Sequence, residues 1–244
     1  MGVRRLIFAL CLTAACSSGN GGGGGGGAAG SGGGGSGGGG SDGGGGAIGA
    51  PENGVATYYD ATGAGACSFD ATPNDLDVAA IDMPEWNGSA QCGECAAVTG
   101  PHGSVTVRIV DLCPECEQGH LDLSMEAFAK IADVSAGRVP ITWQVVPCAV
   151  TGNVEYRYKE GSSQYWTAIQ VRNHRLPITS LEVQLGGAWQ PVARSDYNYF
   201  VDAAGVGTTG GFSVRITASD GQQLVDALPP VQSALVVTGA AQFQ

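Results

Sequence analysis

Basic residues are scarce in this chain of 244 residues, which holds 11 Lys and Arg against 22 Asp and Glu. The deficit is greatest in residues 51–148, where 14 acidic residues accompany 3 basic ones, while residues 149–244 hold 7 and 6. Because phosphate binding requires a basic surface, the first half excludes nucleic acid as a partner. It also disfavours anionic polymers, so a neutral glycan is the better ligand.

The chain also lacks an apolar run long enough to cross a bilayer at its N-terminus. Leu6–Ala15 is an apolar stretch of about ten residues, too short for a spanning helix, and it follows Arg4 and Arg5. Residues 1–16 are therefore expected to be a signal peptide that exports the protein. The small residues before Cys16 resemble a bacterial lipoprotein signal, which would leave the protein lipid-anchored at the cell surface. Ordinary cleavage nearby, with no lipid, is the alternative.

Residues 17–50 are almost entirely Gly with scattered Ser. Such a composition cannot bury a core and behaves as a flexible linker, with a span on the order of 30 Å. The remaining residues suit two domains of about 100 residues each.

Cysteine is missing from residues 149–244. The pairs Cys92–Cys95 and Cys113–Cys116 have the spacing of a four-thiolate zinc site, and the second pair also fits a redox motif. Export to an oxidising compartment and an even count favour three structural disulfides and no metal. Six cysteines allow 15 pairings, so the connectivity stays open. Of the eight cysteines, Cys11 and Cys16 belong to the expected signal peptide, and the other six are Cys67, Cys92, Cys95, Cys113, Cys116 and Cys148.

Short strands are expected throughout, because segments with β-branched residues alternate with Gly, Pro and Asn. One helix is expected at residues 124–131, with Ser124 as its cap. In the first half the expected strands are residues 54–59, 95–99, 104–110 and 141–146. After Cys148 they are residues 154–159, 168–171, 181–185, 199–201, 212–217 and 234–237. The second half, without helix or cysteine, is typical of a β-sandwich. The sequence therefore predicts an all-β protein with domains at residues 51–148 and 149–244.

Several motifs occur together in a fixed order. They are GVATYYD at 54–60, VRIVDLCPEC at 107–116, LDLSMEAF at 121–128, TGNVEYRYKEGSSQYWTAIQVRNHRLP at 151–177 and SDYNYF at 195–200. On these motifs, residues 53–244 resemble the bacterial expansins. The resemblance implies a six-stranded double-psi β-barrel with a short helix, related to family-45 glycoside hydrolases. It implies that an immunoglobulin-like β-sandwich follows, which is a family-63 carbohydrate-binding module.

In the first domain the resemblance implies a polysaccharide groove. Asp122 matches the aspartate that corresponds to the general acid of the family-45 hydrolases, Asp111 matches a second polar groove residue, and Thr57 matches a threonine that lines the groove. Cys113 stands where some bacterial members have tyrosine. Asp60 lies near the position of the hydrolase base, one residue short of its spacing, and is interpreted as a turn residue after a strand.

In the second domain the resemblance implies an aromatic platform for a glucan chain. Tyr165, Trp166 and Tyr197 match its three rings, and Lys159 matches a basic residue beside it. Exposed aromatic rings suit the C–H faces of pyranose sugars. Neighbours on a strand point to opposite faces, so Tyr165 and Trp166 can both face a ligand only if the backbone bulges or they lie on a loop.

The implied function is non-hydrolytic loosening of the cell wall, by a protein that binds cellulose and related β-glucans. Peptidoglycan is a second polymer to consider. No cofactor is expected, and the protein is expected to be a monomer. Two alternatives stay open. One is a glycoside-cleaving enzyme, either an endoglucanase or a peptidoglycan lytic transglycosylase, that uses Asp122. The other is a surface protein that only binds carbohydrate. The three histidines are too scattered to indicate a metal site or a nucleophile–base pair.

Overall fold

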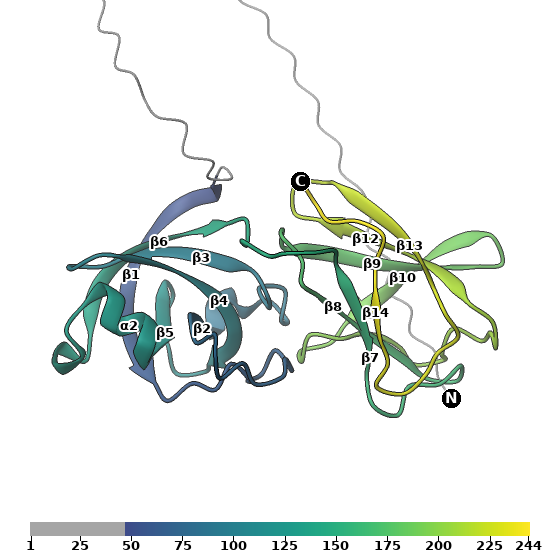
Figure 1. The fold of residues 1–244 in the computed structure, drawn as a ribbon, viewed down its shortest axis with the longest axis horizontal. Coiled ribbons are helices and arrows are strands. Elements are labelled where there is room, and N and C mark those ends of the chain that lie inside the picture. Colours follow the sequence, from purple (N-terminus) through teal and green to yellow (C-terminus); the bar gives the residue numbers. More distant parts are fainter. Residues whose placement is uncertain (1–46) are drawn as a thin grey trace, which may run out of the picture. The chain divides into compact units, whose positions relative to one another are not determined.

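Two groups of strands make up residues 47–244, the part of the chain that the computed structural model describes (Figure 1). The expected all-β fold with two strand assemblies is confirmed. The expected signal peptide, Cys16 and most of the linker lie outside the described residues. The linker was expected to reach residue 50, but the first strand begins at Ile48, which pairs with Val145.

Six strands close into a barrel in the order β1-β5-β2-β4-β3-β6. Neighbouring strands are antiparallel except for two parallel pairs, β1 with β5 and β2 with β4. The strands are β1 (Ile48–Tyr59), β2 (Val78–Asp82), β3 (Cys95–Thr99), β4 (Ser104–Cys113), β5 (His120–Ser124) and β6 (Val139–Val146). β2 and β5 were not among the strands expected from residue patterns.

Two short α-helices accompany the barrel, α1 (Met83–Trp86) and α2 (Met125–Ile131), and a 3-10 turn follows at Val134–Ala136. The expected cap of α2 is confirmed, because the backbone N–H of Ala127 donates to Ser124 Oγ at 3.0 Å. α2 buries Phe128 against the barrel. Helix and barrel therefore share one core.

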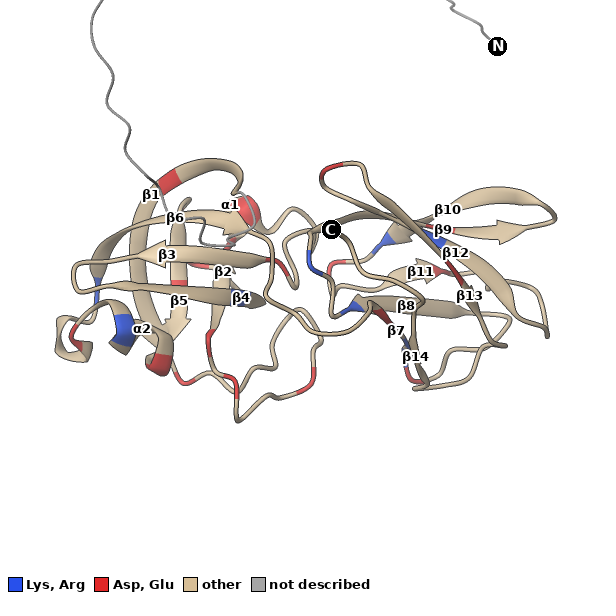
Figure 2. Cartoon of the chain, turned by 45° about the horizontal axis from the view of Figure 1, so that its top comes forward, with Lys and Arg blue, Asp and Glu red and all other residues tan. Residues whose placement is uncertain are grey.

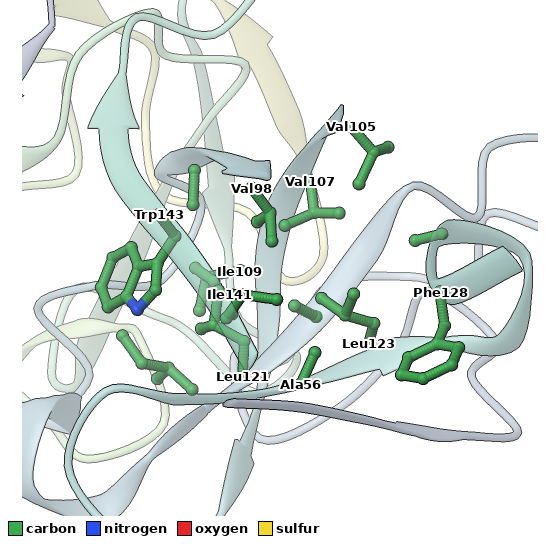
Figure 3. Packing of buried hydrophobic residues seen from close by; sticks show 14 of the residues in the cluster. Ala56, Val98, Val105, Val107, Ile109, Leu121, Leu123, Phe128, Ile141 and Trp143 are labelled. Atoms are coloured by element: carbon green, nitrogen blue, oxygen red, sulfur yellow. The ribbon is translucent and has the colours of Figure 1, made fainter. Parts of the chain in front are cut away.

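The barrel core consists of aliphatic side chains from β1, β3, β4, β5 and β6, with Trp143 at one end and Phe128 at the other (Figure 3). The strands approach so closely that a Cβ on Gly54 would lie 1.7 Å from the carbonyl oxygen of Gly119. The indole N–H of Trp143 donates to that same oxygen at 3.2 Å. Glycine at position 54 is therefore required for β1 to reach its place beside β5.

Eight strands form the second assembly, in the order β13-β12-β9-β10-β11-β8-β7-β14. Its two halves enclose one hydrophobic core, as expected of a sandwich. Tyr156 of β7 joins the halves by donating a hydrogen bond of 2.7 Å to Asp226 of β13. The strands are β7 (Glu155–Tyr158), β8 (Thr167–Arg172), β9 (Ile178–Leu185), β10 (Ala188–Arg194), β11 (Phe200–Asp202), β12 (Phe212–Ala218), β13 (Gln223–Leu228) and β14 (Val236–Thr238).

All six cysteines of the described residues form disulfides, as expected. The pairs are Cys67–Cys92, Cys95–Cys148 and Cys113–Cys116. The zinc spacing was misleading, because Cys92 and Cys95 belong to different disulfides. Within residues 47–244, no group of three His, Cys, Asp or Glu side chains is placed to hold a metal ion.

The barrel and the sandwich are joined by residues 147–154, and the expected boundary at residues 148 and 149 falls in this connection. Both belong to one unit of the chain, and side chains of the sandwich bond to the barrel loop that contains Cys67. The buried Gln170 donates to the Cys67 carbonyl at 2.9 Å, and Asn198 donates to it at 3.2 Å. Arg172 forms an ion pair of 2.7 Å with Asp70 of the same loop.

The barrel is strongly acidic, whereas acidic and basic residues are nearly balanced in the sandwich. Acidic segments spread over the strands and loops of the barrel, whereas basic segments lie mainly on strands of the sandwich (Figure 2). Within residues 47–244 no helix has the length and apolar character needed to cross a membrane.

Candidate functional site

The residues expected to line a groove in the barrel include Asp122 on β5. Leu121 and Leu123 on either side are fully buried in the core, so strand alternation turns Asp122 to the other face. The parallel register of β1 and β5 pairs Thr57 with Asp122, and the Thr57 hydroxyl donates a hydrogen bond to the Asp122 carboxylate. The expected association of these two residues is thus present in the structure.

His120, which was not expected from the motifs, belongs to the same cluster. Its Nε2 lies 2.9 Å from the Thr57 hydroxyl oxygen. A hydroxyl has one proton, so when Thr57 donates to the ionised Asp122, its oxygen accepts from the Nε2–H tautomer of His120. Burial lowers the pKa of His120, which favours a neutral ring at pH 7. Thr57 therefore links a neutral imidazole to the carboxyl group of Asp122.

The protonation of Asp122 is set by opposing effects. Burial raises the pKa of Asp122 above that of an exposed aspartate, and the negative charges of Glu115 and Asp111 act in the same direction. The hydrogen bond from Thr57 opposes this rise, and so does the positive charge of His120 at a pH where its ring is protonated. Because burial is the largest effect, Asp122 keeps its proton to a higher pH and can donate a hydrogen bond to a glycan oxygen.

Asp111 on β4 has a different environment. Its Oδ1 accepts the backbone N–H of Ala66 at 2.7 Å and that of Leu112 at 2.9 Å. A Cβ on Gly65 would lie 2.4 Å from the Asp111 carboxyl carbon, so the loop approaches as closely as glycine permits. Asp111 thus ties the loop at residues 65–68 to the barrel.

Asp122 and Asp111 lie in one row across three strands, because Ala80 on β2 pairs with both of them. Neighbouring strands are about 4.8 Å apart, so the two aspartate backbones are separated by about 10 Å. Ala80 lies between the two aspartates in this row and contributes only a methyl group.

Tyr59 of β1 lies near both aspartates and was not expected there from the motifs. Its ring packs against Ala80, Cys113 and Cys116. Burial, together with the charges of Asp111 and Asp122, raises the pKa of Tyr59. Cys113 stands where some family members have tyrosine, and here Tyr59 brings a phenol to the neighbourhood of both aspartates.

Asp60 follows the last residue of β1 and is exposed. The negative charges that raise the pKa of Asp122 come from Glu115 and Asp111. This placement supports the interpretation of Asp60 as a turn residue.

The aromatic pair Tyr165 and Trp166 lies on a turn between β7 and β8. Ser163 and Trp166 exchange backbone hydrogen bonds of 2.8 and 3.3 Å, which leaves Gln164 and Tyr165 as the two central residues of a tight turn. Tyr165 is 75% exposed and Trp166 is partly exposed. The turn frees both rings from strand alternation, which was the condition set by the sequence.

Tyr197 lies on another turn, between β10 and β11, and is 38% exposed. Lys159 Nζ lies 5.7 Å from the centre of the Tyr197 ring and 5.4 Å from that of Tyr199. Tyr199 is buried, so Tyr197 is the ring of this pair that reaches the surface. Lys159 therefore contributes a cation–π contact that holds Tyr197, in addition to its charge.

Comparison with known proteins places this geometry in a family. Residues 52–143 match the family model described as lytic transglycolase. Expansin-YoaJ of Bacillus subtilis (strain 168) is 40% identical over 203 residues, which cover 78% of this chain and 85% of that protein. Expansin-like protein 1 of Dictyostelium discoideum is 32% identical over 202 residues, which cover 77% and 70%.

Solved structures agree with these relatives. The crystal structure of apo Clavibacter michiganensis expansin has a TM-score of 0.74 and 37% identity, covering 80% of this chain and 98% of that one. A mutant of the same expansin in complex with cellohexaose also has a TM-score of 0.74, at 36% identity.

Proposed function

This chain belongs to the expansin family, and we propose that it binds cellulose and related β-glucans and loosens the contacts between wall polysaccharides without cleaving them. Support for the ligand comes from the related expansin that was crystallised with cellohexaose. In this chain, Tyr165, Trp166 and Tyr197 are the rings proposed to stack on the glucan. Lys159 is proposed to support the platform, and Asp122 is proposed as the central groove residue, with Thr57 and Asp111 beside it.

The non-cleaving part of this proposal rests on the hydrogen bonds that Asp111 already makes to the backbone. Cleavage of a glycosidic bond requires one carboxyl as acid and a second as base or nucleophile. Asp111 is the other carboxylate in the row with Asp122, and it already accepts two backbone N–H groups. This role as a loop anchor leaves Asp122, whose pKa burial raises, as the acid of the row. A single acid can exchange hydrogen bonds with a glucan but lacks the partner for hydrolysis.

We further propose that the protein is exported and acts outside the cell as a monomer, with a lipid anchor at Cys16. The anchor is tested by growing the producing cells with radiolabelled palmitate. Label in the protein that disappears in Cys16→Ala supports the anchor, and secretion of unlabelled protein contradicts it.

The function is tested by holding heat-inactivated plant wall strips under constant load in a bath of the purified protein. Extension without sugar release, lost in Asp122→Asn, is the expected result. Asp133→Asn, an exposed residue of the barrel, is the matched control and should extend the strips as the wild type does. If the protein binds cellulose but the wall strips do not extend, it is a carbohydrate-binding protein without loosening activity.

Glycan cleavage is the second candidate function, and the match of residues 52–143 to the lytic transglycolase model favours it. In the same bath, new reducing ends would indicate an endoglucanase. Anhydro-sugars released from purified peptidoglycan would indicate a lytic transglycosylase. Either product, if it disappears in Asp122→Asn, would replace the proposed function.

A further inference from the structure

A small pocket of about 260 Å³ lies at the base of the turn that carries Tyr165. Gln164 forms part of its wall and directly precedes Tyr165 in the turn. The pocket, called the side pocket below, therefore lies beside the turn that carries Tyr165, the most exposed ring of the proposed platform. It is lined by Ser162, Ser163, Gln164, Thr208, Thr209, Pro230 and Val231.

The walls of the side pocket are held in place by backbone contacts. The Gly207 N–H donates to the Gln164 carbonyl at 2.9 Å, which fastens the loop after β11 to the aromatic turn. Gly205 has a φ of 72°, and a Cβ there would lie 2.2 Å from the same carbonyl oxygen. The loop thus approaches the turn more closely than a residue with a side chain would allow. The side pocket is consequently preformed.

The chemistry of the lining suits a neutral sugar. The seven lining residues include four hydroxyls and one carboxamide, with Pro230 and Val231 as apolar surface and without a charged side chain. Thr208 Oγ1 accepts the Gly210 N–H at 3.0 Å, which leaves its own O–H free to donate outward. The Gln164 carboxamide makes no hydrogen bond to residues 47–244, so it can both donate and accept. Sites for uncharged ligands combine apolar walls with a few such polar groups.

We propose that the side pocket binds a single neutral sugar that branches from a β-glucan whose backbone lies on the platform. The inference rests on the proposed function, because it needs the glucan backbone on Tyr165 and Trp166. The side pocket is smaller than the cavities of about 300–1,000 Å³ that hold larger ligands, so it has room for one ring and not for a second chain. Linear and branched glucans would then be distinguished beside the aromatic rings, and the binding module would prefer the branched polymer.

The test compares two probes with the same number of backbone glucose units. One is a linear cello-oligosaccharide, and the other is a xyloglucan oligosaccharide that carries single xylose branches. Calorimetric titration of the wild type should give about tenfold tighter binding of the branched probe, equivalent to about 1.4 kcal/mol. Thr208→Phe fills the side pocket and should abolish this preference while the linear probe binds as before. Thr238→Phe, at an exposed threonine of β14 that does not line the side pocket, should keep the preference.

The outcomes separate the two proposals. Equal or weaker binding of the branched probe by the wild type overturns the branch subsite and leaves the glucan platform intact. A preference that persists in Thr208→Phe also overturns it, provided that the variant melts at the wild-type temperature. If Thr208→Phe unfolds, Gln164→Ala takes its place, and the same loss of preference is required. Failure of the wild type to bind the linear probe overturns the proposed function and the subsite together.

Discussion

The proposed groove and the proposed platform present their side chains in different ways. The groove uses regular strands, in which register brings Thr57 beside Asp122 and partial burial changes the pKa of the carboxyl. The platform uses tight turns, in which Tyr165 and Tyr197 escape strand alternation and reach solvent. Partial burial shifts the pKa of a side chain on a strand, whereas a turn exposes more of a ring to a ligand.

The two assemblies also differ in how they are stabilised, because all three disulfides lie in residues 67–148. Replacing Cys95 and Cys148 by Ala should lower the free energy of unfolding by about 4 kcal/mol, since this disulfide closes the largest loop. The matched double variant at Cys113 and Cys116 should lose only about 2 kcal/mol, because its loop is short. Urea titration measures both. Equal losses would show that loop closure is not what the disulfides contribute.

Binding should depend chiefly on the platform. The double substitution Tyr165→Ala with Trp166→Ala should weaken adsorption to cellulose about a hundredfold, or about 2.7 kcal/mol, because exposed rings dominate such contacts. Adsorption isotherms on insoluble cellulose measure the effect. Trp189→Ala on β10, a partly exposed tryptophan outside the platform, is the control and should bind as the wild type does. If the double variant adsorbs as the wild type does, Tyr165 and Trp166 do not bind cellulose.

Buried carboxyls should make the stability of the barrel depend on pH in an unusual direction. Glu94 is 3% exposed, and burial raises its pKa to about 8. The folded state therefore keeps a proton that the unfolded state releases at about pH 4.5, so stability falls as pH rises from about 4.5 to 8. Burial likewise raises the pKa of Glu85 to about 9, which acts in the same direction.

Glu94→Gln should remove part of this dependence on pH. The free energy of unfolding of the variant, relative to that of the wild type, should be higher at pH 7 than at pH 4 by on the order of 2 kcal/mol. Chemical unfolding at both values of pH measures the difference. Glu126→Gln, at an exposed position of α2, should leave the dependence unchanged. An equal change of stability with pH in Glu94→Gln and the wild type would show that Glu94 is ionised in the folded protein.

The smallest expected effect concerns Thr57. Its hydrogen bond stabilises the charged form of Asp122, so Thr57→Val should raise the pKa of Asp122 further. NMR titration of the carboxyl carbon of Asp122 measures the shift. Thr99→Val, at an exposed position of β3, provides the comparison. A lowered pKa in Thr57→Val would reverse the assignment of donor and acceptor.

Residue patterns predicted much of the fold but missed four strands. β2 has the sequence VAAID, in which the alanines give no strand signal, although all five residues are buried. β10 contains Pro191, which argues against a strand. The structure accommodates it because β11 pairs only with Ala193 and Arg194 of β10. β13 carries Asp226, which is unusual in a strand because it is buried. Its carboxylate accepts a hydrogen bond from the Tyr156 hydroxyl on the opposite half of the sandwich.

The site shows the same limit. The motifs identified Asp122 and Thr57, but the part played by His120 depends on a strand pairing between residues 63 positions apart. Spacing in the sequence places His120 and Asp122 on one face of a strand and says nothing of β1. The disulfide partners also depend on the fold. Cys92 and Cys95 are close in sequence, but Cys92 bonds to Cys67 and Cys95 bonds to Cys148.

The parallel pairing of β1 with β5 has a consequence for the time course of folding. β1 finds its two neighbours only in β5 and β6, so the first strand has no partner until residues 120–146 have been synthesised. Contacts that close such long loops slow folding, because their entropy is lost before the contacts form. The barrel is therefore expected to fold late and as a whole, whereas the sandwich can begin from hairpins of adjacent strands such as β12 and β13.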